Sequence, residues 1–208
     1  MGTVAEMFLH AASTSIAVTN VSSPLGSLLV ASTEGGVCAL TFDDRVESLE
    51  PKLRRTFGHF FRFRDGDPLG VVEQLLSYCA GDLTALEGVP LNVAGTPMQR
   101  RVWDMVRALR AGQLTTYAAL AERLGMPRAQ RAVGVCLASN PAPLFIPCHR
   151  VVAASGGLGS HPAGIPRKRW LLSHEGVLAA EELSVARSVR RRLAPRERGL
   201  ADLADLAC

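Results

Sequence analysis

Short runs of β-forming residues fill the first third of the chain. Ser15–Val21, Ser27–Ser32 and Gly36–Phe42 are rich in β-forming residues, and the turn sequences Ser-Pro-Leu-Gly and Glu-Gly-Gly separate them. Short connections of this kind join antiparallel strands. The pattern therefore predicts an antiparallel meander at the start of the fold.

A helical period replaces these short runs further along the chain. Val46–Thr56 and Leu69–Cys79 are predicted helices, and a Gly-Asp pair follows the second one. The segment Leu83–Val93 contains Pro90 and is predicted to be extended. We expect this segment to connect two halves of the molecule.

The second half of the chain is predicted to be mainly helical. Thr96 can cap a helix that has Pro97 at its first position. Ala118–Leu124 and Pro127–Ser139 are predicted helices joined by a glycine-containing turn, and Pro166–His174 is a last one. The middle pair is a candidate helix-turn-helix, a common arrangement that does not by itself indicate DNA binding.

Small residues and arginines share the second helix of that pair. Ala129, Ala132 and Gly134 would let the helix approach another surface closely, and Arg128 and Arg131 project from the same region. That surface could be a nucleic-acid groove or a neighbouring helix of the core. The residues of this helix leave both interpretations open.

Composition limits the class of protein. In 208 residues, 48% are hydrophobic and 20% are charged, which allows a packed core and excludes wholesale disorder. The formal net charge of +4 permits an anionic partner without requiring one. The first residues have no cationic segment ahead of an apolar run, and no apolar stretch is long enough to span a bilayer. We expect an intracellular protein with no membrane partner and an α/β (α+β) fold.

The cysteines argue against a disulfide scaffold. They are odd in number and widely spaced, with no Cys-x-x-Cys pair and no Cys/His cluster of structural-zinc spacing. Reduced thiols fit this pattern, and one of them could be a nucleophile. The five cysteines are Cys38, Cys79, Cys136, Cys148 and Cys208.

Segment 140–152, Asn-Pro-Ala-Pro-Leu-Phe-Ile-Pro-Cys-His-Arg-Val-Val, carries the strongest chemical signal. Its three prolines fix backbone torsions, so the loop gives Cys148 the rigid mount that nucleophilic catalysis needs. On an extended backbone Cys148 and His149 would point to opposite faces, so we expect a water molecule between them. These residues alone also allow a buried structural cysteine beside a satisfied histidine.

Several segments, taken in order, resemble one family. The family is that of the O6-alkylguanine-DNA alkyltransferases, or methylated-DNA–protein-cysteine methyltransferases. The first ninety residues match it only in general pattern, through the opening hairpin that starts at Ser23-Pro-Leu-Gly, and the tail beyond about Leu178 falls outside the resemblance. The matching segments are Thr96–Trp103, Thr116–Ala121, Arg131–Gly134, Asn140-Pro141, Ile146–Val152 and Arg167–Gly176.

The resemblance implies a chemistry for the Pro-Cys-His-Arg loop. Cys148 would accept an alkyl group from O6 of guanine, and from O4 of thymine, in one irreversible displacement that leaves a thioether. His149 would take the thiol proton through water, and Glu175 would orient the imidazolium. Asn140 would tie a helix end to the loop, and Arg150 would be a structural anchor. No metal or cofactor is implied.

The resemblance also implies a DNA partner. Double-stranded alkylated DNA would bind through its minor groove, with the target guanine flipped out of the stack. Arg131 would fill the vacated space, and Tyr117 would serve guanine N3 and rotate the target phosphate. The carbonyls of Cys148 and Val151 would accept from the exocyclic amine. Further DNA-binding candidates are Arg128, Ala129, Ala132 and Gly134.

Further implications concern organisation. A ribonuclease-H-like α/β domain would cover residues 1–93, the DNA-binding and alkyltransferase domain 94–178, and a basic extension 179–208. We expect a monomer that is cytoplasmic and nucleoid-associated, or nuclear in a eukaryote.

One loop departs from the family. Where relatives have a Gly-Tyr-x-Gly-Gly type of loop, this chain has Gly-Ser-His-Pro-Ala-Gly at 159–164, so His161 replaces the tyrosine. Pro162 falls where a backbone N–H donates to guanine O6 in relatives, and proline has no N–H. His161 or the Ala163 N–H could substitute, and otherwise we expect slower transfer or a changed preference for adduct size. Candidate pocket residues are Pro143, Val151, Ser155, His161, Pro162 and Ala163.

Other classes of protein fit less well. A cysteine hydrolase would need an oxyanion hole that no motif indicates, and a plain helix-turn-helix repressor would not need the rigid loop. A non-enzymatic alkyl-lesion sensor of alkyltransferase-like type shares the flipping machinery but lacks the acceptor cysteine. That alternative stays open only if Pro162 disables transfer.

Overall fold

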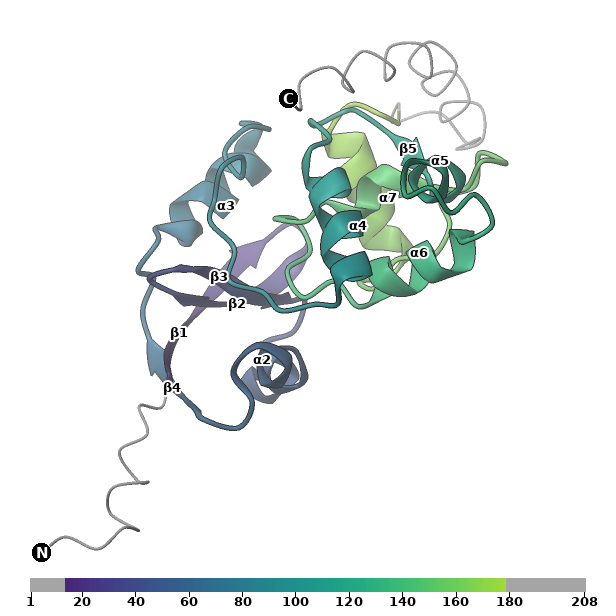
Figure 1. The fold of residues 1–208 in the computed structure, drawn as a ribbon. Coiled ribbons are helices and arrows are strands. Elements are labelled where there is room, and N and C mark those ends of the chain that lie inside the picture. Colours follow the sequence, from purple (N-terminus) through teal and green to yellow (C-terminus); the bar gives the residue numbers. More distant parts are fainter. Residues whose placement is uncertain (1–13, 179–208) are drawn as a thin grey trace, which may run out of the picture.

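A sheet-bearing half and a helical half lie side by side in the structure, a computed structural model that describes residues 14–178 (Figure 1). The predicted basic extension 179–208 lies outside the described residues. So do residues 1–13. Among the described helices, none is long and apolar enough to cross a membrane.

The predicted meander is confirmed. β1 (Thr14–Ser23), β2 (Gly26–Thr33) and β3 (Gly36–Thr41) pair in antiparallel order, and every bound lies within two residues of its predicted place. Residues of β2 and β3 are buried almost throughout, because both faces of this sheet are covered.

A fourth strand was not predicted. β4 (Phe61–Asp65) pairs parallel with β1, so the sheet is mixed and has the order β3-β2-β1-β4. Its sequence, Phe-Arg-Phe-Arg-Asp, is exposed over four of five residues. An edge strand of this kind lacks the buried apolar run by which the inner strands are recognised.

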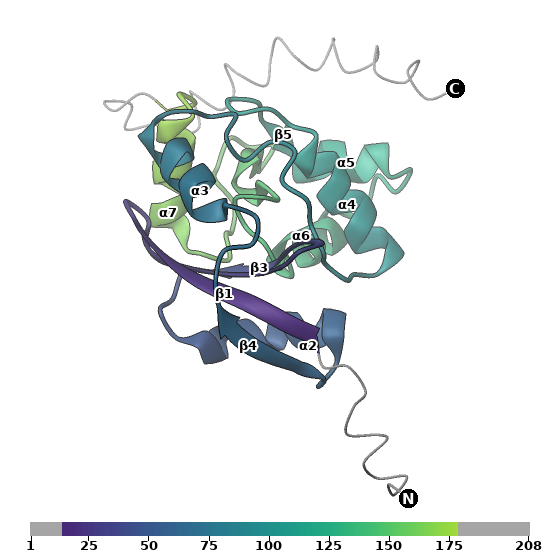
Figure 2. The same cartoon turned by 90° about the vertical axis from the view of Figure 1, so that its left-hand side faces the viewer.

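Helices cover both faces of the sheet (Figures 1 and 2). The predicted helix over 46–56 is a short 3-10 helix, η1 (Val46–Leu49), continued by α2 (Glu50–Phe57). These pack Leu49 and Leu53 against one face, and α3 (Val71–Ala80) packs Leu75 and Tyr78 against the other.

The expectation of an extended segment over 83–93 is wrong for its first part. Residues 83–88 form turns, because the Asp82 carboxylate accepts hydrogen bonds from the backbone N–H and hydroxyl of Thr84 at 3.0 and 2.7 Å. Only the end of the segment is extended, where Leu91 forms an isolated parallel bridge with Val37.

Local capping signals set the helices of the second half. Thr96 and Gln99 form the capping box that starts α4, with Pro97 in its first turn. The helix predicted to start at Pro127 starts at Gln130, since residues 127–129 lie in the preceding turn. The elements are α4 (Pro97–Arg107), β5 (Thr115–Thr116), α5 (Tyr117–Arg123), α6 (Gln130–Ala138), η2 (Cys148–Arg150), β6 (Val151–Val152) and α7 (Ile165–His174).

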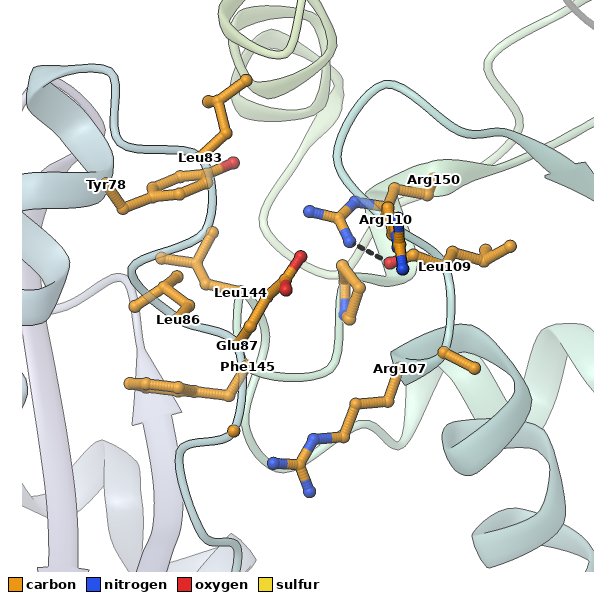
Figure 3. A pocket seen from close by; sticks show the side chains of 13 residues that line it. Tyr78, Leu83, Leu86, Glu87, Arg107, Leu109, Arg110, Leu144, Phe145 and Arg150 are labelled. Atoms are coloured by element: carbon orange, nitrogen blue, oxygen red, sulfur yellow. Dashed lines mark hydrogen bonds between the residues drawn. The ribbon is translucent and has the colours of Figure 1, made fainter.

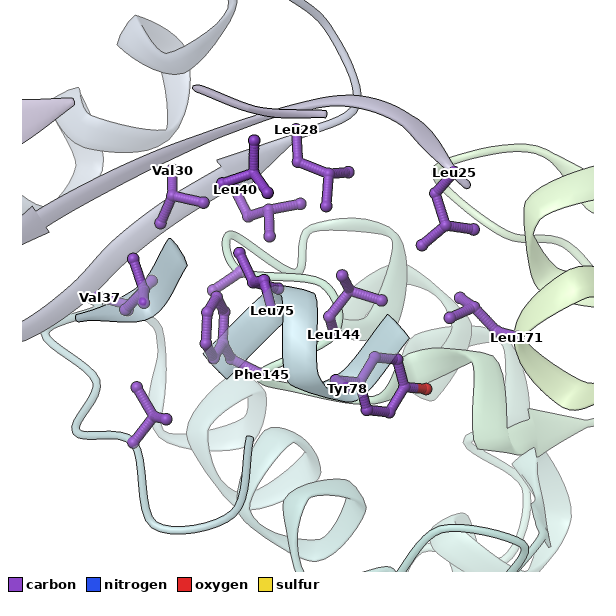
Figure 4. Packing of buried hydrophobic residues seen from close by; sticks show 14 residues of the cluster. Leu25, Leu28, Val30, Val37, Leu40, Leu75, Tyr78, Leu144, Phe145 and Leu171 are labelled. Carbon is purple, nitrogen blue, oxygen red and sulfur yellow. The ribbon is translucent and has the colours of Figure 1, made fainter. Parts of the chain in front are cut away.

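The two halves share a hydrophobic core (Figure 4). Leu144 and Phe145, from the loop between α6 and η2, pack with Leu28, Leu75 and other residues of the sheet-bearing half. The loop that carries the candidate nucleophile is therefore part of this core. A domain boundary at residue 93 stays a prediction.

Candidate active site

Asn140 fixes the shape of the proline-rich loop. Its side-chain amide donates to the carbonyl of Ile146 at 2.8 Å, and its side-chain oxygen accepts from the backbone N–H of Ala142 at 3.0 Å. Between them Leu144 is held at a φ of 78°, a conformation that costs a non-glycine residue about 1–3 kcal/mol. The surrounding contacts hold the loop in this one shape, as its prolines predict.

The sheet-bearing half supports the same loop. The backbone N–H of Leu40 in β3 donates to the carbonyl of Pro141 at 2.9 Å. The ammonium group of Lys52 in α2 donates to the carbonyls of Leu40 and Pro141. Burial lowers the pKa of Lys52 from 10.5 to about 8.

Cys148 and His149 lie in the 3-10 helix η2, so the expectation of an extended backbone is wrong. The N–H of Cys148 donates to the carbonyl of Ile146, and that of Arg150 to the carbonyl of Pro147. This tight winding follows from Pro147, which directs the chain into a turn. Cys148 is only 3% exposed and His149 only 1%.

Glu175 accepts from four groups at the centre of the site. Its side chain is fully buried and lies 2.9 Å from His149 Nε2 and 2.7 Å from an Arg150 guanidinium nitrogen. The Tyr78 hydroxyl donates to it at 2.8 Å, and the N–H of Gly112 at 3.2 Å. Arg150 also donates to the carbonyl of Leu109, which makes it the anchor that the sequence predicts.

These partners keep Glu175 ionised. Burial alone would raise its pKa, but the hydrogen bonds and positive charges of His149 and Arg150 outweigh burial and hold the pKa well below its usual range. Burial lowers the pKa of His149 while Glu175 opposes that effect. His149 Nδ1 is buried and has no hydrogen-bond partner within residues 14–178, so this nitrogen is available to take a proton.

Burial raises the pKa of the Cys148 thiol, and neighbouring groups oppose the rise. A hydrogen bond from Asn140 and the charges of Lys168 and Lys52 favour the thiolate. Lys168 is fully buried, donates to the carbonyl of Val151 at 2.5 Å, and has its pKa lowered by burial to about 8. Two lysines, one from each half, therefore direct positive charge toward the sulfur.

The imidazole of His161 also lies near the sulfur. Its Nε2 lies 3.7 Å from Cys148 Sγ, and its Nδ1 accepts from the N–H of Ala163 at 3.2 Å. Tyr117 lies against the same loop and donates to the carbonyl of Ser160 at 3.3 Å. Gly159 has a φ of +69°, and a Cβ there would come within 2.9 Å of the Tyr117 ring, so only glycine lets the two approach.

The remaining predicted residues lie around this centre. Arg131 is exposed in the first turn of α6, and Arg128 is exposed in the turn before this helix. Ala129, Ala132 and Gly134 are half-buried, and Gly134 lies beside the Tyr117 ring. Pro143 and Val151 are buried, Ser155 and Pro162 are exposed, and Ala163 is half-buried.

A separate cavity of about 200 Å³ lies where the two halves meet (Figure 3). Tyr78 and Arg150 line it, and Cys148 does not. The cavity therefore borders two hydrogen-bond partners of Glu175 and not the thiol. Among the described residues, no group of three or more His, Cys, Asp or Glu side chains could hold a metal ion.

Sequence reasoning missed three contributors to the site, Tyr78, Lys52 and Lys168. Lys168 stands in an Arg-Lys-Arg run that suggests a solvated surface. It nonetheless shares the buried face of α7 with Leu171 and Leu172, at spacings of three and four residues, which is the signal that identifies it. Tyr78 and Lys52 carry no comparable signal, since their partners lie far away in the sequence.

The fold and the site together define a protein with a buried cysteine directly before a histidine that is paired with a buried glutamate. A family profile described as "6-O-methylguanine DNA methyltransferase, DNA binding domain" matches residues 97–177. A methylated-DNA–protein-cysteine methyltransferase of Salmonella typhimurium is 37% identical over 161 residues, which cover 76% of this chain and 94% of the relative. One of Mycobacterium tuberculosis is 41% identical over 116 residues, 56% of this chain and 70% of the relative.

Solved structures agree with these sequence relatives. Mycobacterium tuberculosis OGT in complex with DNA has a TM-score of 0.65 at 34% identity, covering 82% of this chain and 98% of that one. The O6-methylguanine-DNA methyltransferase of Pyrococcus kodakaraensis has a TM-score of 0.61 at 27% identity, covering 78% and 99%. The chain belongs to the methylated-DNA–protein-cysteine methyltransferase family.

Proposed function

We propose that this protein repairs DNA by moving the alkyl group of O6-alkylguanine, and of O4-alkylthymine, onto its own Cys148. The observation that carries the proposal is the position of Cys148 at the end of a rigid loop, directly before a histidine paired with a buried carboxylate at 2.9 Å. Because a thioether does not return to a thiol, each molecule acts once.

His149 and Glu175 prepare the nucleophile. The thiol proton passes through a water molecule to His149 Nδ1, the ring nitrogen without a partner among the described residues. Glu175 holds the other ring nitrogen and stabilises the imidazolium that forms, as the carboxylate does in a catalytic triad. The thiolate then attacks the alkyl carbon in line with the departing oxygen, and Asn140 keeps the loop in place.

DNA is the partner, and α6 with the preceding turn is the proposed contact. Arg128 and Arg131 are exposed there, and the half-buried small residues beside them allow close approach to the minor groove. A thiol that is 3% exposed cannot reach a base inside a duplex, so the nucleotide must be flipped out and Arg131 fills its place. The protein acts as a monomer, in the compartment that holds the DNA.

The flipped base meets several groups of the proposed pocket. Tyr117, held against Gly159, reaches guanine N3 and the target phosphate. The carbonyls of Cys148 and Val151 accept from the exocyclic amine. The Val151 carbonyl already accepts from Lys168, which leaves the second lone pair of its oxygen for the base.

The test uses the full chain and a duplex that carries one O6-methylguanine with a radiolabelled methyl group. We expect label on the protein up to one methyl per molecule, and none with Cys148→Ser. Cys136→Ser is the matched control, since Cys136 is also buried in the helical half, and it should label like the wild type. Binding of the lesion without any transfer would instead indicate a lesion sensor and overturn the proposal.

A further inference from the structure

The loop that carries His161 forms a tight turn over residues 161–164. The N–H of Gly164 donates to the carbonyl of His161 at 3.0 Å, and Pro162 occupies the second position, where proline is favoured in such turns. The third residue of the turn is Ala163, whose N–H points back at the imidazole of His161. Pro162 therefore holds Ala163 in the position from which it bonds the ring.

This turn selects one tautomer of His161. Nδ1 accepts from the Ala163 N–H at 3.2 Å, so it carries no proton, and a neutral ring must then have its proton on Nε2. Burial, together with the charges of His149 and Lys168, lowers the pKa of His161 to about 3, which keeps the ring neutral near pH 7. The Ala163 N–H is itself engaged and is not the free donor of this loop.

The Nε2–H points toward the reacting atoms. The Nε2 nitrogen lies 3.7 Å from Cys148 Sγ. In an in-line displacement the alkyl carbon starts about 3–3.5 Å from the sulfur, and the departing oxygen lies one bond further along the same line. A donor beside this line can donate a hydrogen bond to the sulfur before the transfer and to the oxygen during it.

We propose that His161, held as the neutral Nε2–H tautomer by the turn at Pro162, is the hydrogen-bond donor to the oxygen that leaves during alkyl transfer. The thiolate pair forms the S–C bond, and the C–O6 bond breaks with its electron pair going to guanine O6. The Nε2–H stabilises this charge, and the guanine then takes a proton from water. His161 gives up no proton. The inference rests on the proposed function, because it needs an alkyl group bound to oxygen.

The experiment compares the side chains at position 161 in single-turnover transfer. His161→Phe removes the donor, and we expect transfer from O6-methylguanine DNA to slow by about 10²-fold. The amide nitrogen of His161→Gln falls near Nε2 and should restore most of the rate. His161→Asn places its amide near Nδ1 and should not. Equal rates for the Gln and Asn variants would overturn the proposal.

A second substrate separates donation to the leaving atom from a structural role. In a duplex with S6-methyl-6-thioguanine the leaving atom is sulfur, which accepts hydrogen bonds weakly. We expect His161→Phe to slow this transfer less than about tenfold, since little donation is lost. Equal slowing on both substrates, or no slowing on either, would overturn the inference.

The tautomer can be observed without any activity. ¹⁵N NMR of the ring nitrogens of His161 in the full chain should show the proton on Nε2, and Pro162→Ala should weaken that preference. A proton on Nδ1 in the wild type contradicts the inference. If the wild-type protein takes up no methyl group at all, the proposed function is wrong. If the wild type transfers the methyl group and the variants at position 161 do so at the same rate, only the role of His161 is wrong.

Discussion

Two carboxylate–arginine pairs, one in each half of the molecule, differ most clearly in their exposure to water. Glu50 and Arg54 in α2 lie 3.0 Å apart with side chains 38% and 50% exposed, whereas Glu175 and Arg150 lie 2.7 Å apart with side chains 0% and 9% exposed. Water screens the first pair, so it contributes little to stability. The second pair is shielded from water and shares its carboxylate with His149, so its charges are tied to the chemistry of the site.

The difference extends to the whole of each half. The helical half supplies Cys148, His149 and Glu175, the groups proposed to react or to move a proton. The sheet-bearing half supplies support, through the backbone of β3, the hydroxyl of Tyr78 and the ammonium group of Lys52. The four predictions that follow alter these contributions and the exposed pair, one at a time.

The largest effect is expected for Glu175→Gln. Loss of the carboxylate leaves the Arg150 guanidinium buried without its counter-charge, which costs about 3–5 kcal/mol of unfolding free energy. Denaturant unfolding measures this cost, and methyl transfer should slow by at least about 10²-fold because the imidazolium of His149 loses its support. Glu122→Gln, at an exposed site in α5, is the control. A stable and fully active Glu175→Gln variant would contradict the role of the pair.

Tyr78→Phe tests whether the sheet-bearing half supports the charge directly. The change removes one hydrogen bond to a buried carboxylate, which should cost about 1.5–3 kcal/mol of unfolding free energy. Transfer should slow less than in Glu175→Gln, because His149 and Arg150 keep their contacts with Glu175. Glu73→Gln, on the exposed side of the same helix, should change the unfolding free energy by less than about 0.5 kcal/mol. Equal costs for the two variants would show that the Tyr78 contact contributes nothing.

The buried lysines predict a pH dependence. Burial lowers the pKa of Lys52 and of Lys168 from 10.5 to about 8, so between these pH values the unfolded chain binds more protons than the folded one. Each lysine therefore makes the free energy of unfolding increase as the pH rises from 8 to 10.5. In Lys52→Met or Lys168→Met this increase should be smaller than in the wild type. Parallel pH curves for all three proteins would contradict the prediction.

The smallest effect is expected for Glu50→Gln. Its partner Arg54 is exposed and loses only a screened contact, so the unfolding free energy should change by less than about 0.5 kcal/mol. High salt should leave the difference from the wild type near zero. A cost close to that of Glu175→Gln would remove the contrast between the two pairs.

Local signals explain which parts of the fold could be predicted from the sequence. The meander, the capping box at Thr96 and the rigid loop before Cys148 are all specified by residues close together in the chain. β4 was not predicted because an exposed edge strand has no apolar run, and the residues of β1 with which it pairs lie 47 positions earlier, as in Thr14 and Phe61. α6 starts at Gln130 and not at Pro127, because residues 127–129 lie in the preceding turn. Pro127 fits both a turn and the first position of a helix, so the sequence alone does not fix where the helix begins.

The site divides in the same way. Cys148, His149 and Glu175 could be predicted from family motifs. The structure brings them together with Asn140 and His161. The contact between Tyr78 and Glu175 joins residues 97 positions apart, and no local pattern encodes such a contact. For the loop at 159–164, the sequence left His161 and the Ala163 N–H as equal substitutes for the donor missing at Pro162. The turn geometry favours His161, because Ala163 is bonded to it.

The most direct measurement is a peptide mass map of the full chain after incubation with a duplex that contains O6-methylguanine. The chain has five cysteines, so the map distinguishes the proposed acceptor from four internal controls. We predict a gain of one methylene on the peptide that contains Cys148 and unchanged masses for the peptides of Cys38, Cys79, Cys136 and Cys208. A methyl group on any other cysteine, or on none while the lesion stays bound, would contradict Cys148 as the acceptor.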